Sequence, residues 1–138
     1  SAVSRGLGDV YKRQIKNSIS TDLALLKTEL ELRPITIETE KPKIGSSACL
    51  ISNSFGLNIG ITCGVISATG LSNIGFNEIE DFLQTDAAAN PGSSGGALVN
   101  LNGELLGMMS GIFTKNTDTN AGVNFAISSS LISKFLAN

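Results

Sequence analysis

The stretch of residues 84–100, QTDAAANPGSSGGALVN, holds the residues of this chain best suited to catalysis. An Asn-Pro pair at 90–91 predicts a tight turn, and Gly92 lets the backbone approach a ligand without a side chain in the way. Ser94 is then expected at the apex of the turn. The backbone N–H groups of Gly92 and Ser94 can converge on one point there, and two convergent donors stabilise the oxyanion of an acyl-transfer intermediate. The alternative interpretation is a glycine-rich hairpin loop without chemistry.

The same segment also matches the pattern G-x-S-x-G at residues 92–96, which is typical of the nucleophile elbow of α/β-hydrolases. That elbow needs a strand before the serine and a helix directly after it. Here an Asn-Pro pair precedes the serine, and the apolar run that follows is short and ends in the turn sequence NLNG at 100–103. The local sequence therefore contradicts an elbow.

The elements that must position this turn are predicted to be mostly short strands. Residues 47–51 and 61–68 are expected to pair antiparallel across the turn residues 53–60, and an Asn-Gly pair at 102–103 predicts a hairpin. Residues 33–43 contain two prolines and are expected to form an extended connector. The predicted strands are 21–27, 47–51, 61–68, 81–84, 97–100, 104–113 and 123–127, with a helix at 129–136, a pattern typical of an all-β barrel or sandwich.

Length and composition exclude several classes of protein. A chain of 138 residues allows one domain. Ten Lys and Arg against twelve Asp and Glu give a net charge of -2, so nucleic acid is not an expected partner. No run of about 18 apolar residues occurs, so the sequence predicts no membrane span. The chain has no histidine, so a Cys/His zinc site is not expected. No cofactor is predicted. An imidazole base would have to come from another chain or from a longer parent of this sequence.

The two cysteines, Cys49 and Cys63, could form one disulfide or be two buried small apolar side chains. Each lies inside an apolar, strand-like run. The sequence therefore favours two buried thiols.

The first residues, 1–14 (SAVSRGLGDVYKRQ), differ from the rest of the chain. They are mostly polar and cationic, and they lack the apolar core of a signal peptide. The string resembles a translated library-adapter sequence, so the genuine chain is expected to begin near Ile15, already truncated. The alternative is a natural disordered N-terminal arm.

Taken together, the motifs resemble the trypsin-like serine proteases of the HtrA/DegP type. The resemblance spans about residues 20–136 and is carried by TDLALLK (21–27), SFGLNIGITCGVISATG (54–70), FLQTDAAANPGSSGGALVNLNGELLGM (82–108) and GVNFAIS (122–128). It implies a chymotrypsin-like double β-barrel with the active site in the cleft between the barrels. Residues 15–43 are then the end of the N-terminal barrel and a linker, and residues 44–138 are the C-terminal barrel with a short C-terminal helix.

The resemblance also implies roles for individual residues. It places the triad acid on Asp22, the nucleophile on Ser94, and the oxyanion-hole amides on Gly92 and Ser94. The family's histidine lies upstream of the motif at 21–27, so the chain as given is expected to be inactive. The family usually has Asn at Ser93, Pro at Ser54 and Ser128, and Gly at Asn124. The implied walls of the primary specificity pocket, which is expected to take a small aliphatic residue, are Ala88, Ser110, Gly111, Ile112, Val123, Asn124 and Phe125.

The function implied is that of a serine endopeptidase that hydrolyses peptide bonds in unfolded or misfolded proteins through an acyl-enzyme on Ser94. The resemblance implies a location in the bacterial periplasm or cell envelope. It implies unfolded proteins or extended peptides as partners, and it is compatible with a homo-oligomer of the intact parent. The alternative function is a non-catalytic, protease-like β-barrel that binds extended peptides.

Other polar residues receive structural interpretations. Asp86 is expected to accept backbone amide hydrogens rather than to act as a second triad acid. The acidic run 78–81 is expected to be a solvated strand entrance rather than a cation site. A Ser-Lys dyad using Lys27, Lys115 or Lys134 is a minor alternative.

Overall fold

The computed structural model describes residues 13–112 and 121–138. Most of the leader expected at 1–14 lies outside the described residues, as do residue 113 of a predicted strand and Lys115. Arg13 and Gln14, the end of that leader, begin strand β1 (Arg13–Ser18).

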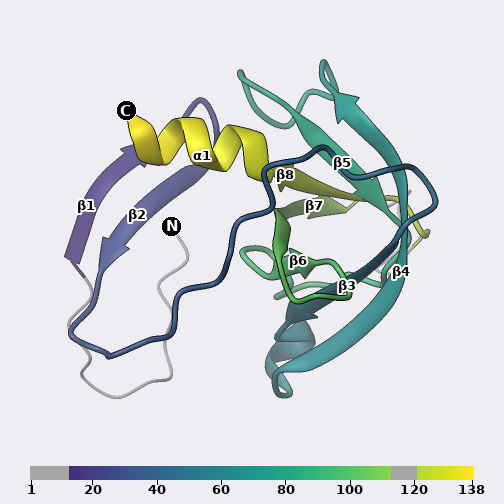
Figure 1. Ribbon diagram of the computed structural model, residues 1–138, viewed down its shortest axis with the longest axis horizontal. Helices are drawn as coiled ribbons and strands as arrows, with labels where there is room; N and C mark the ends of the chain where they lie inside the picture. Colours follow the sequence, from purple (N-terminus) through teal and green to yellow (C-terminus); the bar gives the residue numbers. More distant parts are fainter. Residues whose placement is uncertain (1–12, 113–120) are drawn as a thin grey trace.

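Six antiparallel strands close into a barrel with the order β3-β4-β5-β8-β7-β6 (Figure 1). The expected pairing of 47–51 with 61–68 is confirmed, since Ser47 faces Val65 and Ile51 faces Ile61. A 3-10 turn, η1 (Ser54–Gly56), lies between these two strands. The barrel strands are β3 (Ser47–Ser52), β4 (Gly60–Leu71), β5 (Phe82–Thr85), β6 (Ala97–Val99), β7 (Leu105–Ile112) and β8 (Asn124–Ser128). The all-β expectation is confirmed.

Strands β1 and β2 (Leu23–Lys27) form a separate antiparallel pair beside the barrel (Figure 1). The strand predicted at 21–27 starts later than expected because Asp22 has a positive φ of 59° and closes the connecting turn. Its N–H donates to the carbonyl of Ile19 at 3.4 Å. The chain then runs to β3 through residues 28–46 and meets the barrel at a bridge between Ile37 and Leu105.

Two apolar clusters are buried, one inside the barrel and one between its outer surface and the elements packed against it. Alternate residues of a strand point to opposite faces, so one set faces the barrel interior and the other faces α1 (Ser129–Ala137) and β2. The predicted helix is confirmed as α1, whose N-cap Ser128 accepts the N–H of Leu131 at 3.2 Å. The inner cluster is Ala48, Leu50, Ile66, Leu83, Ala87, Ala89, Leu98, Leu106, Met109 and Ala126. The outer cluster is Leu23, Phe82, Leu105, Phe125, Ile127, Ile132 and Phe135.

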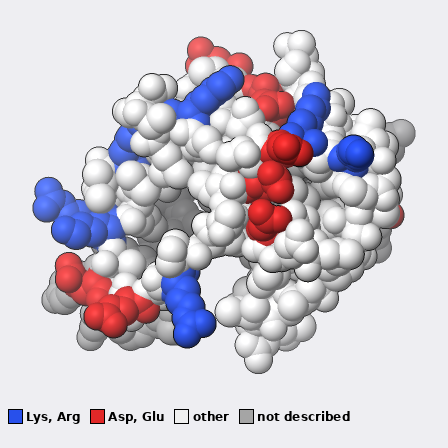
Figure 2. Space-filling view, in the orientation of Figure 1, with Lys and Arg blue, Asp and Glu red and all other residues white. Residues whose placement is uncertain are grey.

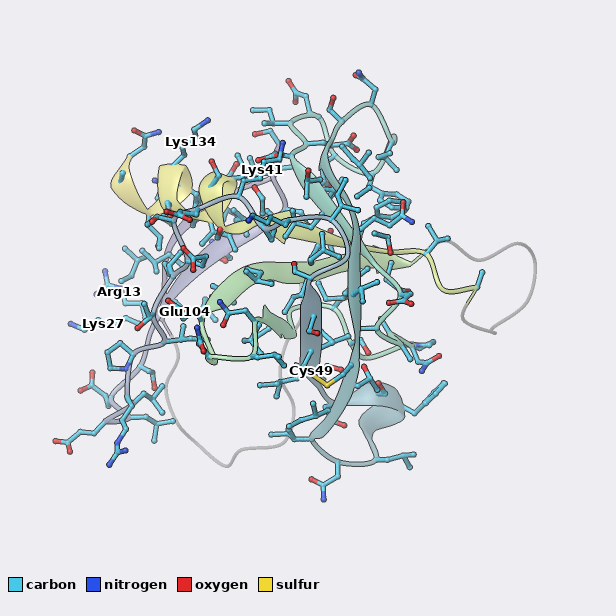
Figure 3. The ribbon with its side chains drawn as sticks, turned by 45° about the vertical axis from the view of Figure 1, so that its right-hand side comes forward. Arg13, Lys27, Lys41, Cys49, Glu104 and Lys134 are labelled. Carbon is cyan, nitrogen blue, oxygen red and sulfur yellow. A yellow bond between two sulfur atoms is a disulfide. The ribbon has the colours of Figure 1, made fainter. Side chains whose placement is uncertain are left out.

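The prediction of two buried thiols is wrong, because Cys49 and Cys63 form a disulfide between β3 and β4 (Figure 3). The two residues are direct partners in the β3–β4 register. Ala48 and Leu50 take the inward positions of β3, so Cys49 points outward and is only half-buried, and Cys63 is exposed. The apolar character of residues 47–51 does not bury every side chain, because only every second residue of a strand faces the core.

Charges are mixed on the surface. Lys and Arg lie among Asp and Glu on the face that Figure 2 shows, with no field of one sign. None of the described helices has the length and apolar character needed to cross a membrane.

Candidate active site

The segment 90–96 forms the tight turn that its sequence predicts. The N–H of Ser93 donates to the carbonyl of Asn90 at 2.9 Å, and the N–H of Gly95 donates to the carbonyl of Met109 at 2.8 Å, which ties the turn to β7. Gly92 has φ +95°, and a Cβ on it would lie 2.6 Å from the carbonyl oxygen of Asn53. Only glycine fits this position without strain.

Ser94 is exposed in this turn, and its Oγ donates to the carbonyl oxygen of Ser110 at 3.3 Å. Among the residues that the structure describes, the backbone N–H groups of Gly92 and Ser94 have no acceptor. The N–H groups of the intervening and following residues are used within the turn or by β7. Two amides beside the Ser94 hydroxyl are therefore available to an oxyanion.

Ser93, directly before the nucleophile candidate, is buried, and its side chain stabilises the turn through hydrogen bonds. Its Oγ accepts the N–H of Asn90 and the hydroxyl of Ser52, each at 3.1 Å, and shares a hydrogen bond of 2.9 Å with the hydroxyl of Ser54. In the sequence, Ser93 and Ser54 stood out only because the resembling family usually has Asn and Pro at these positions. The structure brings them together, so β3 and η1 support the turn through hydroxyl groups.

Asp22 reaches the same site from the β1–β2 turn. Its carboxylate accepts the hydroxyl of Ser110 at 3.4 Å. Ser110 thus contacts Asp22 through its side chain and Ser94 through its carbonyl oxygen. The two residues carried over as acid and nucleophile lie on either side of Ser110.

Both residues line a cleft of about 530 Å³ between the β1–β2 pair and the barrel. Asp22 is the one titratable group among the described residues that line it. Lys27 and Lys134 are not in that lining, so the structure does not bring a lysine to Ser94 within its described part. The described lining of the cleft therefore holds an acid and a hydroxyl but no basic side chain.

The residues implied as pocket walls fall on two faces of the barrel wall. Asn124 is fully buried, and its side-chain amide donates to the carbonyl oxygens of Thr85 at 3.2 Å and Ala87 at 2.9 Å. Phe125, the next residue, packs in the outer cluster and pairs with Gly111 of β7. Ala88 and Val123 are half-buried, and the backbone of Ile112 pairs with that of Asn124 at the end of β7.

Two carboxylates near the site bind backbone amides. The expectation for Asp86 is confirmed, because its Oδ1 accepts the N–H of Val65 at 2.8 Å. Glu80 was expected only to be part of a solvated strand entrance, but it accepts four consecutive backbone N–H groups, from Ile74 to Asn77, at 2.6 to 3.0 Å. These hydrogen bonds, that of Asn77 foremost, lower the pKa of Glu80 below its ordinary value. The spacing of acidic residues gave no sign of this contact, because it depends on how the loop 74–77 curls.

Comparison with known proteins gives a consistent set of relatives. A family profile described as a trypsin-like peptidase domain matches residues 2–108. The periplasmic pH-dependent serine endoprotease DegQ of Escherichia coli is 40% identical over 114 residues, which are 80% of this chain and 25% of that protein. The periplasmic serine endoprotease DegP of Salmonella typhimurium is 40% identical over 115 residues, 81% of this chain and 24% of that protein.

A solved structure, the HtrA-type protease AlgW with a decapeptide, superimposes with a TM-score of 0.88 at 39% identity. That match covers 93% of this chain and 40% of the solved one. The chain thus spans about a quarter of the length of the curated relatives it matches.

Proposed function

The chain belongs to the trypsin-like peptidase family, in its HtrA/DegP type, and from this premise we propose that it is part of a serine endopeptidase acting through Ser94. The observation that carries the proposal is the contact of Ser110 with both Asp22 and Ser94 in one cleft. The N–H groups of Gly92 and Ser94, which have no acceptor in the described part of the chain, support it, because acyl transfer needs donors for the oxyanion.

The proposed reaction needs an imidazole that this chain does not contain. The imidazole would take the proton from the Ser94 hydroxyl as Oγ forms a bond to the scissile carbonyl carbon, and would return it to the leaving amine as the C–N bond breaks. Water would then hydrolyse the acyl-enzyme. Asp22 would hold the imidazole in the correct tautomer. The family's histidine precedes the motif at 21–27, and the polypeptide as given is proposed to be inactive.

We assign β1 and β2 to the end of the N-terminal barrel, residues 28–43 to the linker, and residues 44–138 to the C-terminal barrel. Exposed apolar side chains on the β1–β2 hairpin support this assignment: Ile15 in β1 is 58% accessible, and Ile19 in the connecting turn is 90% accessible. Further strands of a complete barrel would cover such a surface.

The proposed substrates are unfolded or misfolded proteins. An extended segment would pair beside residues 110–112 of β7 and bring its carbonyl to Gly92 and Ser94. The proposed location is the bacterial periplasm or cell envelope. The names of the two enterobacterial relatives contain the word periplasmic, and the Cys49–Cys63 disulfide agrees with an oxidising compartment.

The test uses the complete protease, which includes this chain and the histidine-bearing strands of the family. Asp22→Asn should lower turnover by about four orders of magnitude, because the imidazole would be held in the wrong tautomer. Ser94→Ala should abolish cleavage and labelling by a serine-directed phosphonate. A complete protein that resists the phosphonate and cleaves nothing, yet binds extended peptides, would replace this proposal with the binding-barrel alternative.

A further inference from the structure

Phe76 lies in the loop between β4 and β5 and reaches across the outer face of the barrel. Its ring packs edge-on against Phe125, with centroids 5.6 Å apart, and against Phe82 at 6.1 Å. Both partners are buried, whereas Phe76 is 46% exposed. The ring therefore has one side on the protein and one side available to another molecule.

The same ring lies directly on the strand beside which a substrate would pair. A Cβ added to Gly111 would be 3.0 Å from Cε2 and 3.2 Å from Cδ2 of Phe76. Gly111 follows Ser110, whose carbonyl oxygen accepts the Ser94 hydroxyl. Phe76 is thus one residue along β7 from the point where the nucleophile candidate contacts that strand.

This surface is separate from the one formed around Asn124. Successive residues of β8 point to opposite faces, so Asn124 enters the barrel wall while Phe125 faces outward toward Phe76. Side chains of an extended substrate alternate in the same way. The residue directed toward Asn124 and the residue that meets Phe76 are therefore different residues of the substrate.

The loop that carries Phe76 is held in place without a ligand. The Glu80 carboxylate accepts the N–H groups of residues 74–77, including that of Phe76 at 2.8 Å. The N–H of Ile79 donates to the carbonyl of Ser20 at 2.9 Å, in the turn that ends at Asp22. The ring is therefore already in position before any peptide arrives, which lowers the cost of binding.

We propose that Phe76 is a specificity-determining residue that selects an apolar, preferentially aromatic, side chain on the acyl side of the scissile bond, outside the primary pocket. This inference rests on the proposed function for the path of the substrate along residues 110–112. The exposed half of the ring offers the edge and face that aromatic pairs use, and the lack of a side chain on Gly111 lets the other half lie against β7.

The test measures binding and cleavage separately in the complete protease. Peptides with alanine at every acyl-side position, or with phenylalanine at one of them, are titrated into the Ser94→Ala form by fluorescence anisotropy. At one position outside the primary pocket, phenylalanine should improve affinity by about 10-fold, the size expected for an apolar contact. Adding Phe76→Ala should remove that preference, measured as the ratio of the affinities for the two peptides, and Phe76→Leu should retain part of it.

Ile74→Ala is the matched control, because it truncates an apolar residue of the same loop that is 36% exposed. It should keep the phenylalanine preference. Equal preference in Phe76→Ala and in the parent form would overturn the inference, as would equal loss in Ile74→Ala, which indicates a general loop effect.

Cleavage by the form with Ser94 intact reports on the proposed function instead. If that form cleaves nothing while the Phe76-dependent preference persists in binding, the protease proposal fails and the selectivity proposal stands. If it cleaves without any dependence on Phe76, the reverse holds.

Discussion

Removing the Cys49–Cys63 disulfide should lower the stability of the chain by about 3 kcal/mol. The two cysteines are separated by 14 positions, and in the chain-entropy account a closed loop of about 15 residues contributes about 3 kcal/mol. Cys63 is exposed and Cys49 is half-buried on the outer face of the barrel, so serine at both positions opens no core cavity. The loss should therefore come from the unfolded state alone.

The corresponding shift in melting temperature follows from the size of the chain. Unfolding entropy is about 2.1 cal/mol/K per residue, which makes about 290 cal/mol/K for a chain of 138 residues. A change of about 3 kcal/mol then lowers Tm by about 10 °C. Thermal unfolding of the printed chain, followed by circular dichroism, compares it with the variant carrying Cys49→Ser and Cys63→Ser.

Reductant is the internal control for this measurement. It should lower the Tm of the oxidised chain to that of the double variant and leave the double variant unchanged. A difference below about 2 °C between the oxidised chain and the double variant would refute the entropic reasoning. A double variant far less stable than the reduced chain would show that the serines disturb the folded barrel instead.

Three further outcomes follow from single contacts. Because the pKa of Glu80 is lowered from its usual 4.5, its support of residues 74–77 is complete above that value and is lost as pH falls through the lower folded-state value. The protection factors of these amides, taken against intrinsic exchange at each pH, should therefore fall in acid, and Glu80→Gln should lower them already at neutral pH. Ser93→Ala should cost about 1 kcal/mol in urea unfolding, since the partly buried N–H of Asn90 and two hydroxyl groups lose a hydrogen-bond partner. A loss below about 0.5 kcal/mol would contradict this. Gly92→Ala should reduce phosphonate labelling of the complete protease while barrel dichroism persists, because the added Cβ meets a carbonyl oxygen at 2.6 Å; unchanged labelling would argue against the assigned turn.

Much of the fold was predictable because its signals are local. Residues 47–51 and 61–68 are rich in apolar and β-branched residues, as strands are, and the turn residues between them left little choice of partner. The helix at 129–136 was predictable from its apolar spacing and from the serine that caps it. Strand β1 was not resolved from its sequence, because its polar residues carry little strand signal.

The candidate site was predictable in part. Gly92 and Ser94 lie in one short turn, whose glycines and Asn-Pro pair predict the exposed serine and the nearby amides directly. Asp22 could be assigned only through resemblance to a family, because it is distant along the chain from Ser94. Its contact with Ser110 depends on how the β1–β2 pair sits against the barrel.

The sequence by itself determined the barrel strands, the nucleophile turn and the family, since each depends on residues within a few positions of one another. Tertiary structure alone decided which residues face outward and which distant residues meet. It paired Cys49 with Cys63 on the outer face of the barrel and laid Phe76 on Gly111. Such contacts follow from strand register and barrel closure, which are set by the packing of the whole apolar core. The residues that neighbour Cys49 or Phe76 in the sequence therefore do not reveal these contacts.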